Sequence, residues 1–393
     1  MERSNSLSRL AETCTACLIT LFGIGLILCT GAVSAAAADA IVLCGRVVIP
    51  SLFPFLVLSS LCLSTGMGGG LCRLLSHPME RLFHLPGSGA PALVLGLIGG
   101  YPVGARTVFD LYDRKGCSAE ECSRLLAFCS CCGPAFLCSA VGVALFGSLR
   151  AGLMLYGCHV GAALVIGLVQ GRFLPKPDRR PIALPASPFL SFARAFTQAV
   201  GSACGAMLNV CAFVVFFAAL MALLEDSGCM GFLKDLLRFL PKGMAEPLVR
   251  GLLEMTGGVA ALGETTCLTF PQAMGLAGGM AGWGGLSVHA QVLALREERD
   301  IPMGRYFTGK LFHGLLAGCL SFCAAFYCLP ESAHHPVFQP LYGAEGVTVL
   351  HPLYYILICG VYLLACLAVT ALVIRLEDRD TRKDGCQTGG KSV

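Results

Sequence analysis

Eight apolar segments, each long enough to cross a lipid bilayer, constrain this chain of 393 residues more than any other feature. A bilayer core requires about 20 apolar residues per helix, and it offers unpaired backbone groups no hydrogen-bond partner. Segments of this kind are therefore expected to be helices, and the chain is predicted to be an all-α polytopic membrane protein. The segments lie at about 13–35, 48–66, 125–147, 151–171, 196–224, 272–294, 306–329 and 350–374.

Composition agrees with this class. Only 13% of residues are charged, against about 25% in soluble domains, and the mean hydropathy is +0.74. The net charge of +4 is too small to indicate a nucleic-acid partner. The 23 cysteines lie mostly inside apolar runs, which favours a packing role over disulfides, and no paired CxxC motif with histidines indicates zinc.

Two further apolar stretches, 90–116 and 246–270, are too short and too interrupted to cross. The first carries Gly99-Gly100-Tyr101-Pro102 and then charged residues that include Arg106, Asp110, Asp113 and Arg114, which would be costly in hydrocarbon. A re-entrant hairpin with this tip at mid-membrane avoids that cost. The second stretch is expected to turn at Thr256-Gly257-Gly258. Unwound backbone at that depth must line a cavity or be buried in protein.

The distribution of basic residues predicts the orientation. With a cytoplasmic N-terminus and both hairpins returning to their own side, 22 of the 28 Lys and Arg residues fall on the cytoplasmic side, Lys310 among them. Both termini are then inside. The first segment resembles a signal peptide before a small-residue run, but its length favours a retained anchor, and cleavage stays open.

The chain between the first and last spans divides into two similar halves, each with a span, an amphipathic stretch, a hairpin and two further spans. Helix breaks are expected at Gly133-Pro134 in one half, and at Gly278-Gly279 through Gly284-Gly285 in the other. Each half is expected to cross the membrane three times, an odd number, so the second half has the opposite orientation to the first. Inverted repeats with broken helices are typical of secondary transporters. The predicted divisions are an anchor (1–38), a first repeat (39–172), a basic cytoplasmic linker (173–195), a second repeat (196–330) and a C-terminal helix and cytoplasmic tail (331–393).

Both hairpin tips are candidate substrate contacts, because half-helix N-termini present N–H groups that suit an anion. Glu254 precedes the second tip, and an acid at that depth is a functional candidate that either binds an ion or caps its own hairpin. A plain packing break is the alternative for both tips. The residues expected to contact substrate lie in and beside the two tips and the first helix break. They are Gly99, Gly100, Tyr101, Pro102, Gly104, Ser130, Gly133, Pro134, Glu254, Thr256, Gly257 and Gly258.

A second cluster contains the only tryptophan, Trp283, with Ser287, His289 and Gln291. Helical spacing places Ser287 and Gln291 on one face and turns His289 away. These side chains suit a small planar ligand, and hydrogen bonding between helices is the nearly equal alternative. His159 and His313, at matching places in the two halves, are weaker candidates.

The segments LIGGYPVGAR, AEECSRLLAFCSCCGPAFLCSAVG, LLEMTGG and GWGGLSVHAQV resemble the sporulation integral membrane protein YlbJ family over about residues 40–330. The resemblance implies nucleoside-recognition gate segments, a layout similar to concentrative nucleoside transporters, and movement of dipicolinic acid out of the mother cell across the outer forespore membrane of an endospore-forming bacterium. Relatives tend to carry polar residues where this chain has Cys129-Ser130-Cys131-Cys132, so only Ser130 offers a polar side chain there.

The expected function is transport of a small anionic aromatic metabolite by alternating access. Nucleoside transport and a sporulation membrane scaffold stay open as alternatives. No enzymatic activity, catalytic residue, metal site, cofactor or nucleic-acid partner is expected. The expected partners are the lipid bilayer and an anionic substrate, and a homo-oligomer stays open. The coupling ion, proton or sodium, is not identified by the sequence.

Overall fold

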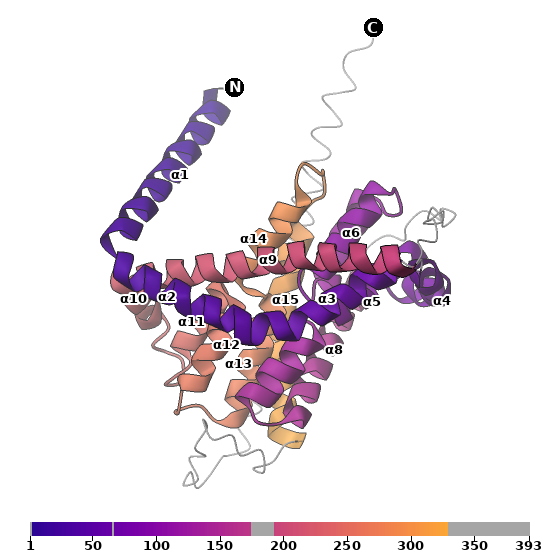
Figure 1. The fold of residues 1–393 in the computed structure, drawn as a ribbon. Coiled ribbons are helices and arrows are strands. Elements are labelled where there is room, and N and C mark those ends of the chain that lie inside the picture. The colour runs from indigo at the N-terminus through magenta and orange to yellow at the C-terminus, as the bar shows by residue number, and fades with distance from the viewer. Residues whose placement is uncertain (1, 65–66, 174–191, 329–393) are drawn as a thin grey trace.

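The computed structural model describes residues 2–64, 67–173 and 192–328, and every regular element in these ranges is a helix (Figure 1). The predicted all-helical fold is confirmed for this part of the chain. The span expected at 350–374, the C-terminal tail and most of the basic linker lie outside the described residues.

Two long antiparallel helical rods pack side by side across the molecule (Figure 1). The first consists of α2 (Thr30–Leu43), a π-helical segment η1 (Cys44–Val48) and α3 (Ile49–Ser64), and the second is α9 (Phe192–Asp226). Small and apolar side chains form their shared core. These are Ala40, Cys44, Val48, Leu56, Ala203, Met207, Val210 and Val214.

The predicted first span is interrupted. Helix α1 (Glu2–Leu28) ends at Cys29, whose φ of −103° and ψ of 28° are not helical, and the apolar window long enough to span a membrane is Thr30–Val48. The four-alanine run in α2 favours helix at this position. The segment expected at 13–35 is therefore split between two helices that meet at an angle (Figure 1).

A second group of helices packs beneath the rods and includes α8 (Leu149–Phe173), α13 (Phe270–Trp283) and α15 (Gly304–Cys328). Glycines let α13 and α15 approach backbone to backbone, as in small-residue contacts between membrane helices. A Cβ on Gly278 would lie 2.8 Å from the carbonyl oxygen of Ala317. The break expected at Gly278-Gly279 is therefore wrong, because these glycines serve packing inside a continuous helix.

Two helical hairpins lie where they were expected. The first consists of α5 (Ala90–Gly99) and α6 (Val103–Asp113), joined by Gly100-Tyr101-Pro102. The second consists of α11 (Ala245–Leu253) and α12 (Met255–Glu264). Its turn is the single extended residue Glu254, so the tip expected at Thr256-Gly257-Gly258 is displaced, and these residues form the first turn of α12.

Two other helices are broken in mid-course. Helix α7 (Ala119–Cys129) starts with a capping box at Ser118 and Glu121, and a loop through Gly133 separates it from the π-helical η3 (Ala135–Leu145). Helix α13 ends at Gly284, and α14 (Gly285–Arg296) follows directly. Gly284 and Gly285 have φ of 88° and 80°, a conformation that favours glycine, so this break matches the prediction.

The succession of elements is the same in both halves of the described chain. A long helix, a short amphipathic helix (α4, Met67–Leu82, or α10, Cys229–Leu236), a hairpin, a broken helix and a 25-residue helix follow one another twice, with a short 3₁₀ turn, η2 (Gly87–Gly89), before the first hairpin. Four helices in these ranges are long and apolar enough to cross a membrane, or five if the α4–α5 pair, bent by 115°, counts as one. Eight spans and the inverted relation of the halves stay predictions.

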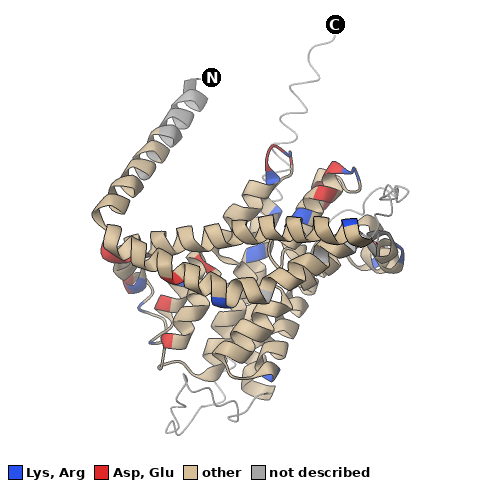
Figure 2. Cartoon of the chain, viewed as in Figure 1, with Lys and Arg blue, Asp and Glu red and all other residues tan. Residues whose placement is uncertain are grey.

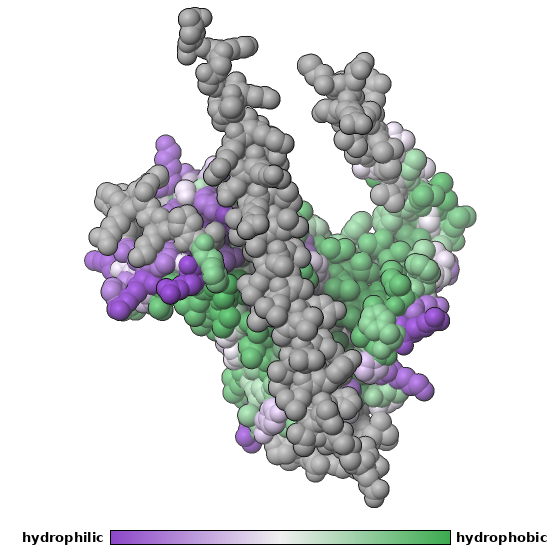
Figure 3. All heavy atoms as spheres, turned by 180° about the vertical axis from the view of Figure 1, so that it is seen from behind, coloured by the Kyte–Doolittle hydropathy of each residue, from purple (hydrophilic) through white to green (hydrophobic). Residues whose placement is uncertain are grey.

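The surface has the character expected in a bilayer. Charged residues are few and gather near the ends of helices (Figure 2). The opposite face carries a broad apolar area with hydrophilic side chains at its margins (Figure 3). Large apolar side chains such as Leu208 and Phe232 are 73% and 70% exposed, which fits contact with lipid.

We expect Gly104→Ala to destabilise the protein by about 1–3 kcal/mol, the usual cost of overpacking. A Cβ at Gly104 would overlap the carbonyl oxygen of Cys129, which lies between the arms of the first hairpin. Gly157→Ala in α8 is the matched control, because its Cβ would meet no atom within 4 Å. Thermal unfolding of both variants in detergent tests this, and equal melting temperatures would contradict the packing of α5, α6 and α7.

Candidate functional site

The four helix breaks meet in the middle of the molecule. A Cβ on Gly100, at the first hairpin tip, would lie 3.0 Å from the backbone nitrogen of Gly133 in the α7–η3 break. A Cβ on Gly285 would lie 3.1 Å from the Cα of Glu254, at the second tip. Tyr101 joins the two pairs, because its hydroxyl would lie 3.3 Å from a Cβ on Gly284. Glycine is required at these points for close approach.

A small cavity lies between the tips and the long helical rods. Its volume of about 40 Å³ holds one or a few water molecules, far below the several hundred Å³ of typical ligand pockets. Apolar side chains of η1, α3 and α9 form one wall. Polar side chains from both tips and from α14 form the other, and these are Tyr101, Glu254, Thr256, Ser287 and Gln291.

The first tip is anchored on a buried lysine. Lys310 of α15 has no exposed surface, and its Nζ donates to the hydroxyl of Tyr101 and, at 2.8 Å, to the carbonyl oxygen of Ser130. It also lies 3.3 Å from Nδ1 of His313 and 4.8 Å from the centre of the Tyr101 ring. The assignment of Lys310 to the cytoplasmic surface is therefore wrong, because α15 carries it into the protein centre.

The partners of Lys310 indicate its charge. The Ser130 carbonyl can only accept, and the Tyr101 hydroxyl already donates to the Ala281 carbonyl at 3.1 Å. His313 Nε2 faces the His159 carbonyl at 2.9 Å and must donate there, so its Nδ1 presents a lone pair. With His313 neutral, all three neighbours accept, and Nζ as an ammonium supplies one proton to each of them. Among the described residues it forms no ion pair with a carboxylate.

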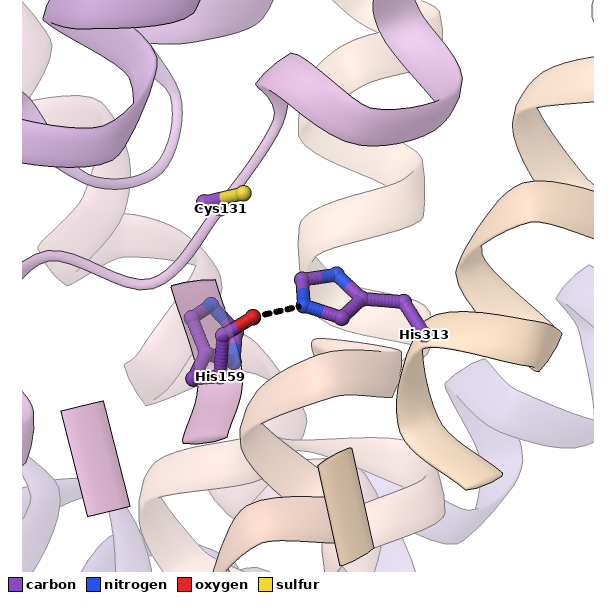
Figure 4. A group of neighbouring side chains, drawn as sticks. All are labelled: Cys131, His159 and His313. Atoms are coloured by element: carbon purple, nitrogen blue, oxygen red, sulfur yellow. Dashed lines mark hydrogen bonds between the residues drawn. The ribbon is translucent and has the colours of Figure 1, made fainter. Parts of the chain in front are cut away.

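Cys131, His159 and His313 lie close together beside this lysine (Figure 4). One potential metal ligand from each falls within 4.8 Å of the others, and the two imidazole rings are 4.3 Å apart. However, His159 Nε2 accepts from the backbone N–H of Cys132 at 3.0 Å, and His313 contacts the Lys310 ammonium. Nδ1 of His159 has no hydrogen-bond partner among the described residues. A metal ion would nevertheless meet the occupied Nε2 of His159, the engaged nitrogens of His313 and the like charge of Lys310, so the group fits a hydrogen-bond network better than a metal site.

The second tip is acidic. Glu254 is 4% exposed, and its two carboxylate oxygens accept the backbone N–H groups of Thr256 at 2.8 Å and of Gly257 at 2.6 Å. The side chain therefore caps the N-terminus of α12, where a negative charge is favoured. Capping was one of the two roles expected for Glu254, and its position in the cavity wall leaves ion binding open.

The tryptophan cluster divides into two parts. Ser287 and Gln291 share a helix face and line the cavity, and Gln291 Nε2 lies 3.5 Å from the Ser287 hydroxyl. His289 is turned away and pairs with the hydroxyl of Tyr306 at 2.9 Å. Trp283 packs edge-on against His289 and donates to the Leu252 carbonyl at 3.1 Å. Neither His289 nor Trp283 lies in the cavity wall in this conformation.

The remaining predicted residues act mainly through the backbone. Ser130 holds Lys310 by its carbonyl and not its hydroxyl, and Gly133 lines the cavity. In the cysteine run, Cys132 lines the cavity, whereas Cys129 and Cys131 are fully buried outside it. Residues that shape the tips and breaks without lining the cavity are Gly99, Gly100, Pro102, Gly104, Pro134, Gly257 and Gly258.

Sequence analysis missed Lys310 and Tyr306. Lys310 stands near the start of an apolar segment, where a lysine usually marks the membrane surface. One signal was available: Lys310 lies three residues before His313, so a helix places both on one face.

The fold and site define a polytopic α-helical membrane protein in which two hairpins and two broken helices enclose a buried polar centre. No protein-family model and no solved structure matches the chain. A curated protein, the Sporulation integral membrane protein YlbJ of Bacillus subtilis (strain 168), is 28% identical over 296 residues, which cover 69% of this chain and 72% of that protein. This similarity supports the resemblance to the YlbJ family that the sequence motifs indicate.

The burial of the cysteine run is testable by thiol labelling. In folded protein, we expect a hydrophilic maleimide to modify the exposed Cys229 and Cys267 more than about tenfold faster than Cys129 and Cys131, because a thiol must be accessible to react. Peptide mass spectrometry measures each site, and unfolding should remove the difference. Rapid modification of Cys129 or Cys131 in folded protein would contradict the placement of this segment.

Proposed function

We propose that this protein is a transporter that moves a small anionic aromatic metabolite, dipicolinate, from the mother cell across the outer forespore membrane during sporulation. The observation that carries the proposal is the Lys310 ammonium, which is fully buried and forms no ion pair with a carboxylate among the described residues. The similarity to a sporulation integral membrane protein supplies the biological setting.

A buried positive charge in a membrane protein is costly and marks a substrate or ion pathway by default. Here neutral oxygens and one imidazole nitrogen solvate it, so its charge is not cancelled within the described protein. An anion entering the centre would supply that missing charge. A carboxylate near Tyr101 would gain a charge-assisted hydrogen bond from Lys310, and an aromatic ring would find the Tyr101 side chain beside it.

The small cavity supports alternating access. A ring with two carboxylates does not fit in about 40 Å³, so the substrate enters only if the tips move apart. Tyr101 separates the cavity from Lys310, and its displacement would open the path between them. The repeated order of long helix, amphipathic helix, hairpin, broken helix and long helix supports this proposal, because it agrees with an inverted-repeat transporter in which the hairpins are the moving parts.

A hollow on one side of the molecule supports an entry path for substrate. This hollow, of about 770 Å³, lies between α6, α9 and the end of α14, and it extends to Pro102 at the first tip. Arg106 and Arg299 line it, and Arg299 holds Asp113 through two hydrogen bonds of 2.8 and 2.7 Å. This guanidinium lowers the pKa of the Asp113 carboxyl. Asp110 and Glu297 also line the hollow, so its charged side chains balance. Its proposed role as an entry path rests on its reach to Pro102 and on the positive-inside rule, which favours the cytoplasmic side.

Nucleoside transport is the second candidate, because the cavity wall also contains the carboxylate of Glu254 and the amide of Gln291. These groups suit the hydroxyls of an uncharged ligand better than they suit an anion. The two candidates differ in their dependence on Lys310, since an uncharged ligand does not need the ammonium.

The test is uptake of labelled dipicolinate into proteoliposomes that contain the purified full chain. We expect saturable uptake, and Lys310→Met should lower kcat/KM by about 10- to 100-fold, the equivalent of one hydrogen bond to a charged group. Lys310→Arg should retain part of the activity. Lys242→Met is the matched control, because Lys242 is exposed on the loop before α11.

Wild-type uptake that Lys310→Met leaves unchanged would contradict the role of this ammonium. Uptake of nucleosides in place of dipicolinate would favour the second candidate. No uptake of either compound, with Lys310→Met protein still supporting sporulation, would contradict transport and favour a scaffold in the forespore membrane.

A further inference from the structure

The acidic tip of the second hairpin has no basic partner in the described structure. Glu254 is buried, and the ion pairs among the described residues do not include it. Its two backbone hydrogen bonds use one lone pair on each oxygen, and the Thr256 hydroxyl also approaches the carboxylate, which leaves at least one lone pair for another ligand. The carboxylate lines the central cavity, so a bound group there would contact it directly.

A second side chain in the same wall also lacks a partner. Gln291 is 3% exposed, and its carbonyl oxygen Oε1 has no hydrogen-bond partner. Its amide nitrogen makes only a long contact of 3.5 Å to Ser287. Exchanging the amide nitrogen and oxygen does not remove the deficit, because the nitrogen would then be the unpaired end. A buried unpaired amide is costly, and a bound ligand in the cavity would explain it.

The chemical groups in this cavity wall indicate which kind of ligand it binds. Apart from the Cys132 thiol, the polar side chains that line the cavity present oxygen beside Glu254: the carboxylate, the Gln291 amide, and the hydroxyls of Ser287 and Thr256. Oxygen-rich sites favour hard cations, whereas zinc and copper prefer nitrogen and sulfur. One carboxylate balances one positive charge, while protein sites for divalent cations usually supply more. A volume of about 40 Å³ holds a small ion with one water molecule.

We propose that this cavity binds one Na⁺ ion, with Glu254 and Gln291 as ligands and Ser287 and Thr256 within the same coordination sphere. Binding of the ion is independent of the proposed function. The consequence of ion binding rests on that function: an anionic substrate in the cavity beside Tyr101 would share its wall with the Glu254 carboxylate, and a bound Na⁺ would cancel the repulsion between them. Transport is then coupled to the cation.

The direct test is binding of ²²Na⁺ to the purified full chain in detergent, in choline chloride buffer without any substrate. We expect saturable binding that unlabelled Na⁺ displaces and an equal concentration of K⁺ does not. Glu254→Gln and Gln291→Leu should each weaken binding at least about tenfold, the loss expected for removing one ligand from the coordination sphere. Glu264→Gln, at the exposed end of α12, should stay within about twofold of the wild type.

Gln291→Leu is included as a second variant that should leave the fold intact. Gln291 makes only one long hydrogen bond, and Glu254 still caps α12 in this variant. Melting temperatures of all variants are measured in parallel. Absence of saturable ²²Na⁺ binding to wild-type protein overturns the proposal, and so does unchanged binding in both site variants. If dipicolinate uptake depends on a pH gradient and not on Na⁺, the result would indicate that Glu254 binds a proton instead.

The binding assay also separates this proposal from the proposed function. Na⁺ binding without uptake of dipicolinate would retain the cation site and contradict dipicolinate transport. Uptake without Na⁺ binding would retain transport and contradict the cation site.

Discussion

The hydrogen bonds around Lys310 are the interaction on which the rest of the centre depends. They bring together the first hairpin tip through Tyr101, the α7 break through Ser130 and the long helix α15 through His313. Tyr101 continues the chain of bonds to Ala281 in α13. One ammonium therefore contacts elements that lie 180 and 209 residues away in sequence, and its bond to the Ser130 carbonyl satisfies one unwound backbone group in the α7–η3 break.

The centre uses opposite charges in different ways on its two sides. The first tip surrounds a cation with neutral acceptors, whereas the second tip surrounds an anion with backbone donors at the start of a helix. Each charge is solvated without being neutralised by an ion pair within the described residues. Each tip therefore retains affinity for a mobile ion of opposite charge. If Lys310 and Glu254 formed an ion pair with each other, each would already have a counter-ion and would bind no further one.

Much of the architecture was predictable because its signals are local. The lengths of the apolar segments predicted most of the helices. The Gly-Gly-Tyr-Pro sequence predicted the first tip, and Gly284-Gly285 predicted a helix break that the structure contains. The glycines at 278 and 279 misled, because contact with α15 gives them a packing role that one helix alone does not reveal. Lys310 was missed for a related reason: its burial depends on where the start of α15 lies in three dimensions, and its partners come from distant segments.

The glycine contacts between α13 and α15 have a consequence for motion. Gly275, Gly278 and Gly282 of α13 lie against the α15 backbone so closely that the two helices must behave as one rigid body. This body carries the ammonium of Lys310 and the hinge at Gly284 together. In the proposed transport cycle, opening of the centre would separate Tyr101 from a positive charge that stays with this body, so the electric field at the site would remain while access to it changes.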